Sequence, residues 1–566
     1  MPDDASDHSR LALFFARRTW LLVAVVTIAA FFLRFRGLGD DWINPDEGIY
    51  YSMLSWTHFS DFWAECAGNA HPPLFYLLLR GMASIGGMPD YVWFRAVALV
   101  FGTLAVPAAW LFTSSAVGRG LVGQVAGLLS ACVIAFSPGM IQLSRIIRPY
   151  MMLLAALTFA GWFLVSWLRD GRRRDLVGYV ATIWIALVTH YAAFLVFGAF
   201  SLVILLHVGL KRLDRRTVID GLVAHTVPIA TITALYFLHL RPRLIGSALA
   251  KQALGGWLRG HMIQDLSGYW LNLLGVMAYV SGEALAGLAT VAFFAGIGFA
   301  IWRRKLSVWA LPLSLYAAAA FAATVHKYPF GCSRHSSYLA SFLLLPVTWL
   351  AARALTTNMA TAIAAIVLCG VSFVQRPVPN TNRSEAVVTS LLGGRHTATY
   401  VFQETTLKRV DLASAARLIS FLQTPGIVIM PQEAYYTLVP LLRRQRESAD
   451  WSDEVKLHTF PWYARTVIVP DAWQLVLDEA ERGHVDHLET MLRMAARRLP
   501  RLKVLEQTDA IFIFAGWTLT TGNLLLTEEA ARPPNARLVK NLYYVRGLMT
   551  FQLNVRRWLA TRRKAK

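Results

Sequence analysis

Two adjacent carboxylates, Asp46 and Glu47, follow the first long apolar run of the sequence. A carboxylate held at a membrane surface can accept a proton from a hydroxyl or an amine as that group attacks. Its neighbour can orient it or help to hold a divalent ion. The same residues also suit a helix start, since Asn44 is a good N-cap, Pro45 fits the first helical position and acidic side chains favour that helix end. The two interpretations are compatible.

A histidine precedes a double proline in the segment HPPL, which begins at His71. The prolines force an extended entry into an apolar helix and place His71 at its corner. Glu47, Glu65 and His71 are candidate ligands for a metal ion, although a turn with an incidental histidine fits the segment equally well. His190 could line the same cavity, or it could be a satisfied core histidine.

Two later turns carry cations. The first contains Arg145 and Arg148 and ends in Tyr150, and the second contains Lys327 and Arg334. Arginines at this spacing share one face if their segment is helical. A guanidinium fork fits phosphate oxygens, and such charges could stabilise a phosphate that leaves as an anion. The alternatives are interfacial snorkelling for the arginines and a simple helix connection for the second turn.

The composition places these residues in a membrane protein. The chain has 566 residues, of which 56% are hydrophobic and 16% charged, with a mean hydropathy of +0.45. A bilayer span needs roughly 20 apolar residues. We expect about eleven spans and a retained first span. The apolar runs lie near residues 19–35, 94–117, 121–137, 150–168, 176–192, 193–210, 222–240, 284–302, 306–325, 337–355 and 360–375.

Short basic clusters between the spans fall on one side if the N-terminus is cytoplasmic. The outer side then carries residues 37–93, 138–149 and 326–336, and a long connection at 241–283 that suits an interfacial helix. Nucleic-acid binding is a poor interpretation of the net charge of +21, because the basic residues are scattered between apolar spans. Beyond residue 376, short strand and helix patterns alternate. The sequence therefore predicts a membrane domain at 1–375 and an outer soluble α/β domain at 376–566.

Taken together, the DE pair, HPPL, the arginine-rich turn ending in tyrosine, and YPFG followed by an arginine resemble the membrane-embedded GT-C glycosyltransferases. The most similar branch is the bacterial one related to protein O-mannosyltransferases and lipid A aminoarabinose transferases. The resemblance covers residues of about 15–375, which is the whole predicted membrane domain.

The resemblance implies a polytopic helical bundle of the GT-C type, with interfacial helices in the first outer loop and a polyprenyl-phosphate sugar donor. It also implies that an acid of this loop activates the acceptor, which matches Asp46 with Glu47 beside it. His71 matches the His or Lys before the double proline. Aminoarabinose transferases carry lysine there, which argues against that exact substrate. The positions that match expected donor contacts are His71, Arg145, Arg148, Tyr150, Lys327, Tyr328 and Arg334.

The expected function is that of a hexosyl or pentosyl transferase that moves one sugar at the periplasmic face of a bacterial inner membrane. The acceptor would be a glycolipid such as lipopolysaccharide, a polysaccharide or a protein, with membrane lipid as a further partner. A divalent metal ion is the candidate cofactor. Transfer of whole glycans is disfavoured, because the tryptophan-rich signature of oligosaccharyltransferases is absent. A transporter or flippase for a phosphorylated lipid is the alternative, but it should show mid-membrane charges or inverted repeats.

Overall fold

The structure is a computed structural model of the chain. It describes residues 4–39, 43, 45–54, 58–86, 91–118, 120–210, 212–245 and 258–357. Beyond residue 357 it describes the backbone of strands between residues 384 and 553. Contacts divide the chain into two compact units. The first comprises Met1–Leu38, Trp63–Gly87 and Val92–Glu404, and the second comprises Gly39–Phe62, Met88–Tyr91 and Thr405–Lys566.

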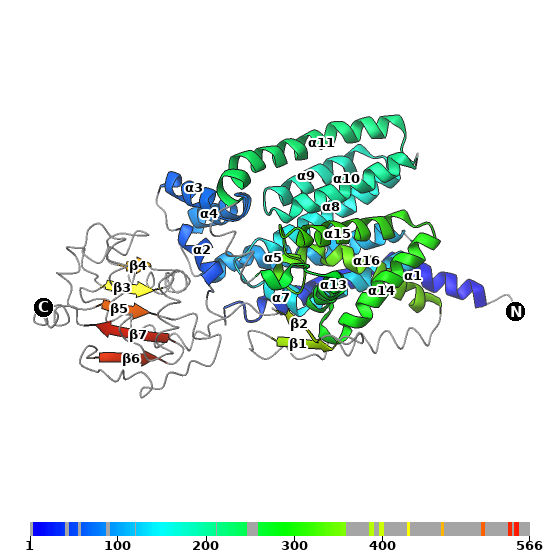
Figure 1. Ribbon diagram of the computed structural model, residues 1–566. Coiled ribbons are helices and arrows are strands. Elements are labelled where there is room, and N and C mark those ends of the chain that lie inside the picture. The colour runs from blue at the N-terminus through cyan, green and yellow to red at the C-terminus, as the bar shows by residue number, and fades with distance from the viewer. Residues whose placement is uncertain are drawn as a thin grey trace, which may run out of the picture. The chain divides into compact units, whose positions relative to one another are not determined.

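Helices dominate the described part of the chain (Figure 1). The α-helices are α1 (Asp4–Phe35), α2 (Pro45–Met53), α3 (Phe59–Gly68), α4 (Leu74–Gly86), α5 (Tyr91–Val117), α6 (Leu121–Phe136), α7 (Pro138–Leu143), α8 (Tyr150–Asp170), α9 (Arg173–Leu187), α10 (Ala192–Gly209), α11 (Arg215–Leu235), α13 (Leu266–Ser281), α14 (Glu283–Trp302), α15 (Leu306–Thr324) and α16 (Ala340–Thr357). A π-helical segment, η1 (Tyr236–Leu244), extends α11, and short 3₁₀ turns occur at η2 (Arg259–His261) and η3 (Arg334–Leu339).

Within the described residues, eight helical segments are long and apolar enough to cross a membrane. They are Arg18–Phe35, Tyr91–Val117, Tyr150–Asp170, Ala192–Gly209, Arg215–Arg243, Leu285–Trp302, Leu306–Thr324 and Arg334–Thr356. The helical membrane architecture predicted from the sequence is therefore confirmed. The runs predicted at 121–137 and 176–192 form the shorter helices α6 and α9. The run at 360–375 lies outside the described residues.

The bundle of the first unit is built from adjacent helix pairs. α9 packs against α8 and α11, α10 packs against α15, and α14 contacts α13, α15 and α16. α11 lies at an edge of this group of helices (Figure 1), and only 11% of its most apolar window is buried. Its exposed side chains include the apolar Leu222, Val223 and Ile229. Such a face suits contact with lipid chains, which are as apolar as these side chains.

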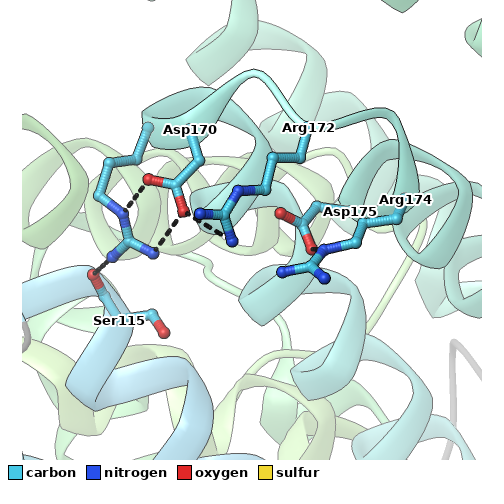
Figure 2. A network of polar contacts seen from close by, with 6 residues as sticks. Ser115, Asp170, Arg172, Arg174 and Asp175 are labelled. Carbon is cyan, nitrogen blue, oxygen red and sulfur yellow. Dashed lines mark hydrogen bonds and ion pairs between the residues drawn. The ribbon is translucent and has the colours of Figure 1, made fainter.

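The turn between α8 and α9 is dense in charge. Gly171 ends α8 in the left-handed region, with φ 63°. Asp170 accepts hydrogen bonds from Arg169 and lies 3.9 Å from Arg172, and Arg169 also reaches the carbonyl of Ser115 at the end of α5 (Figure 2). Arg169 and Arg172 belong to one of the short basic clusters between the predicted spans. That this turn faces the cytoplasm stays a prediction.

A buried arginine joins α1 to α6 and α7. Arg34 is fully buried, and its guanidinium group donates to the carbonyl oxygens of Ile134 and Ala135 at distances of 2.8 Å. These carbonyls belong to the last turn of α6, where no intrahelical donors remain. Arg34 Nε also donates to Ser144 Oγ at 3.0 Å, directly after α7. One side chain thereby fixes the start of the turn that contains Arg145 and Arg148.

The strands form two sheets. β1 (Ser384–Thr389) pairs antiparallel with β2 (Arg395–Tyr400). The second sheet has the order β4-β3-β5-β7-β6, in which β4, β3 and β5 are parallel and β7 and β6 are antiparallel additions. Its strands are β3 (Ile427–Met430), β4 (Thr466–Ile468), β5 (Ile511–Phe514), β6 (Asn541–Val545) and β7 (Leu548–Leu553). These strands lie beyond residue 376, where the sequence predicts an α/β domain. The helices predicted there lie outside the described residues, and the division at residue 375 stays a prediction.

Gly102 of α5 tests the importance of the Arg34 junction. A Cβ atom at this position would lie 2.1 Å from Ser144 Oγ and 3.3 Å from Arg34 Nε. We expect Gly102→Ala to destabilise the protein by about 1–3 kcal/mol, because the added methyl group displaces the hydroxyl that Arg34 binds. Thermal unfolding in detergent measures this. The control is Gly198→Ala in α10, where a Cβ atom meets nothing within 4 Å and alanine favours the helix. Equal unfolding temperatures for the two variants would contradict the assignment.

Candidate functional site

The acidic pair begins helix α2 in the second unit. Asp46 and Glu47 occupy its first turn, where the helix dipole favours negative charge. Asp46 is half-buried and Glu47 is 1% exposed. The following residues Tyr50, Tyr51 and Met53 are also buried, so the helix is enclosed by protein along most of its length. The structure thus confirms that the acidic pair begins a helix, and the catalytic role of Asp46 stays a prediction.

In the first unit, four separate turns bring aromatic rings together. His71 comes from the turn before α4, His190 from the turn between α9 and α10, Tyr150 from the start of α8 and Tyr328 from the turn after α15. The ring centroids of His71 and His190 lie 4.5 Å apart, and the Tyr150 ring lies 6.3 Å from His71 and 5.5 Å from His190. Tyr328 lies 6.2 Å from His190. We call this group, with Arg148, Arg334 and His335, the aromatic-cationic cluster.

Two guanidinium groups approach the Tyr150 ring. The Cζ atoms of Arg148 and Arg334 lie 5.6 Å and 5.8 Å from its centroid, within the range of cation–π attraction. The Tyr150 hydroxyl lies 3.4 Å from His335 Nε2, and the Tyr328 hydroxyl donates to the His335 carbonyl at 3.4 Å. Tyr150 is 1% exposed and Arg148 is 7% exposed. The cluster therefore concentrates positive charge in a buried setting, which is suited to an anion.

The turn that carries Tyr328 and Arg334 is braced by its neighbours. The backbone N–H of Phe330 donates to the carbonyl of His261 at 2.9 Å. Gly331 has φ 155° and donates its N–H to Ser336 Oγ at 3.0 Å. A Cβ atom there would lie 3.1 Å from His261 Nδ1, so glycine fits both the backbone angle and the space. The backbone angle and the space together explain the glycine of the YPFG sequence.

Arg145 and Arg148 point to different places. Residues 144–149 form a turn instead of a helix, so the condition for a shared face is not met. Arg145 donates to the carbonyls of Leu33 and Arg34 at the end of α1, where helical carbonyls need donors. Arg148 instead belongs to the aromatic-cationic cluster. Lys327 is exposed, whereas Arg334 is half-buried, so the two cations of this turn lie in different surroundings.

The metal candidates fall in different parts of the chain. Glu47 lies in the second unit, while Glu65 and His71 lie in the first. Across the described ranges, no group of three His, Cys, Asp or Glu side chains could hold a metal ion. The candidate ligands Glu47, Glu65 and His71 therefore gain no support from the geometry of the described residues.

Burial and charge keep the histidines of the cluster neutral. Burial, and then the neighbouring His190 and the charges of Arg148 and Arg334, hold the pKa of His71 well below its usual value. Burial and then Arg148 lower the pKa of His190 to about 3. Burial raises the pKa of Tyr328 well above its usual value. At neutral pH the arginines therefore carry the charge, and the other groups act as neutral hydrogen-bonding partners.

Several buried polar groups of this region were missed by the sequence analysis. Ser333, Ser337 and Tyr338 are each less than 5% exposed, and their hydroxyl oxygens have no hydrogen-bond partner among the described residues. His335, which adjoins Arg334 in the cationic turn, contacts Tyr150 directly. The signal was the polar run that follows Gly331, since serine and tyrosine at the start of an apolar span need partners.

The Tyr191 side chain extends the cluster toward α11. Its hydroxyl hydrogen-bonds with His239 Nδ1, and the two rings stack at 5.9 Å with an interplanar angle of 22°. His239 lies in the π-helical segment η1. The turn that holds His190 is thus tied to the segment that extends α11. π-helical segments are frequent near functional sites.

No protein-family model matches the sequence, and no curated protein matches it either. Solved structures are similar in fold. ArnT from Cupriavidus metallidurans bound to undecaprenyl phosphate has a TM-score of 0.52 and 13% identity, with 94% of this chain and 98% of that chain covered. Its apo state has a TM-score of 0.53 and 12% identity, with coverage of 95% and 98%. The oligosaccharyltransferase of Archaeoglobus fulgidus, in complex with Zn and sulfate, has a TM-score of 0.51 and 11% identity, with coverage of 94% and 73%. The chain therefore has the fold of the GT-C membrane glycosyltransferases, as the resemblance implied.

The lowered pKa of His190 predicts acid sensitivity. Below its usual pKa of 6.5 the unfolded chain binds a proton that the folded protein does not bind until about pH 3. Stability therefore falls as the pH drops from 6.5 toward 3, by about 2 kcal/mol at pH 5 for this residue. His190→Asn should flatten the fall in unfolding temperature between pH 7 and pH 5. The exposed His326 provides a control substitution to Asn. Parallel pH curves for wild type and His190→Asn would disprove this assignment.

Proposed function

We propose that this chain is a membrane glycosyltransferase that moves a single sugar from a polyprenyl-phosphate donor to an acceptor at the outer membrane face. The observation that carries the proposal is the pair of guanidinium groups at 5.6 Å and 5.8 Å from the buried Tyr150 ring. The fold supports it, because ArnT, which has the same fold, was crystallised with undecaprenyl phosphate.

The cluster suits the departing phosphate. When the bond between the sugar and the phosphate oxygen breaks, negative charge develops on that oxygen. Arg148 and Arg334 provide fixed positive charge there and need no proton transfer to the leaving group. Burial strengthens this attraction, because the effective dielectric constant is lower than in water. Tyr150, Tyr328 and His71 complete the proposed donor site as neutral partners.

Asp46 is proposed to act on the acceptor. Its carboxylate accepts the proton of the attacking hydroxyl or amine as the new bond to the sugar carbon forms and the bond to phosphate breaks. Glu47, which is 1% exposed, orients the start of α2. The sugar carbon inverts its configuration in such a single displacement. Arg145 acts indirectly in this proposal, through its hydrogen bonds to the end of α1.

The remaining assignments follow from the same proposal. The protein lies in a bacterial inner membrane with its N-terminus cytoplasmic and its C-terminal domain periplasmic. The acceptor is a glycolipid, a polysaccharide or a protein. Lys327, which is exposed, would meet the donor only at the edge of the site. A flippase would also bind lipid phosphate, but it would have no use for Asp46 as a base.

Asp46→Asn tests the chemical step. We expect a loss of transfer of about 10²–10⁴-fold, since the amide cannot accept the proton. Binding of undecaprenyl phosphate should stay within about twofold of wild type, because the cluster is unchanged. Transfer is followed by mass spectrometry of glycolipids and glycoproteins from cells that produce each variant. Asp61→Asn, at an exposed acid of α3, is the matched control. Near-normal transfer by Asp46→Asn would refute the role of the base.

Arg148→Ala tests the phosphate site. We expect the affinity for undecaprenyl phosphate to fall about tenfold or more, because a buried charge-assisted contact is lost. Arg172→Ala, at an exposed arginine of the α8–α9 turn, is the matched control and should bind as wild type does. Native mass spectrometry of the purified proteins with the added lipid measures both. If the two variants bound equally well, the cluster would not be the phosphate site.

A further inference from the structure

His190 holds one tautomer. The backbone N–H of Ala192 donates to its Nδ1 atom at 3.1 Å, so Nδ1 is the acceptor nitrogen of the ring. In a neutral imidazole the other nitrogen then carries the hydrogen atom. Nε2 of His190 is therefore a hydrogen-bond donor, and its direction is fixed by the turn between α9 and α10.

That donor is buried among the groups of the aromatic-cationic cluster. His190 is 4% exposed, and Nε2 has no hydrogen-bond partner among the described residues. By contrast, both ring nitrogens of His225 on α11 are bonded, one to the Gly221 carbonyl and one to the Tyr179 hydroxyl. Leaving a buried donor unsatisfied is unfavourable. The turn thus holds a buried histidine within the cluster with one N–H group left for a further acceptor.

The surroundings of His190 indicate what this donor meets. Its ring is 4.5 Å from His71 and 5.5 Å from Tyr150, the ring that Arg148 and Arg334 approach. An anionic oxygen drawn to these arginines is the acceptor that this region would hold. A neutral N–H can bind such an oxygen without adding a third positive charge to the cluster.

We propose that the Nε2–H group of His190 donates a hydrogen bond to a phosphate oxygen of the polyprenyl-phosphate carrier. The proposal rests on the proposed function and adds a residue to its phosphate site. His190 is thus a specificity-determining residue for the phosphate group, distinct from the charges of Arg148 and Arg334.

Two amide substitutions separate the donor from the structural bond. Asparagine places its amide near the position of Nδ1, so His190→Asn keeps an acceptor for Ala192 and removes the distal donor. Glutamine reaches the position of Nε2, so His190→Gln keeps the distal donor and removes the acceptor. The probes are undecaprenyl phosphate and undecaprenol, which lacks the phosphate. His225→Asn serves as a control outside the cluster.

We expect His190→Asn to lower the affinity for undecaprenyl phosphate about tenfold, as loss of a hydrogen bond to a charged group does. His190→Gln should remain within about threefold of wild type, and undecaprenol binding should not change in either variant. Affinities come from native mass spectrometry, and thermal unfolding confirms that each variant is folded. If His190→Asn does not fold, His190→Phe replaces it as the donor-free variant with the same expected loss.

Three results would overturn the inference: equal affinity of both variants for undecaprenyl phosphate, a larger loss in the glutamine variant, or equal losses for the two lipids. The last result would indicate a structural role alone. If wild type itself did not distinguish undecaprenyl phosphate from undecaprenol, the proposed function would fail first. The two failures are therefore distinguishable.

Discussion

The site depends on holding two guanidinium groups beside one buried tyrosine. Like charges repel strongly where the dielectric constant is low, so the side chains around Arg148 and Arg334 must be arranged to tolerate them. The face of the Tyr150 ring attracts both cations. The histidines nearby remain neutral, because burial and these same charges disfavour their protonation. The tyrosines and the neutral imidazoles then supply hydrogen bonds without changing the charge.

The helices around the cluster serve mainly to bring short turns together. Two of these turns are fixed by contacts outside the cluster. Arg34 anchors the segment before Arg148 through the last carbonyls of α6 and through Ser144. The N–H of Phe330 anchors the segment before Arg334 to His261. The polar groups of the site therefore lie on loops whose ends are held by buried hydrogen bonds. Functional residues are often found on loops that a rigid scaffold positions.

Much of the architecture could be predicted from the sequence, because bilayer spans are long and apolar and basic clusters separate them. The motifs also identified Arg148, Tyr150, Tyr328 and Arg334, which meet in the structure. The sequence could not show that Arg145 and Arg148 have different roles, because that depends on whether residues 144–149 form a helix. They form a turn, and Arg145 therefore contacts the end of α1 instead of the cluster. The orientation of the His190 ring could not be predicted from the sequence either. It follows from one backbone hydrogen bond, which leaves no pattern in the sequence. The assignment of Asp46 as a base and the boundary at residue 375 stay predictions.

The π-helical end of α11 has an evolutionary consequence. Because π-helical hydrogen bonds span one residue more than α-helical ones, the segment Tyr236–Leu244 can absorb an insertion or a deletion. A single-residue deletion there would leave the packing of α11 on α9 in place and rotate His239 away from Tyr191. Length variation in this segment would thus change the support of one site turn while the rest of the bundle is inherited unaltered. Proteins of this fold can therefore differ in length at this segment while their membrane spans stay the same.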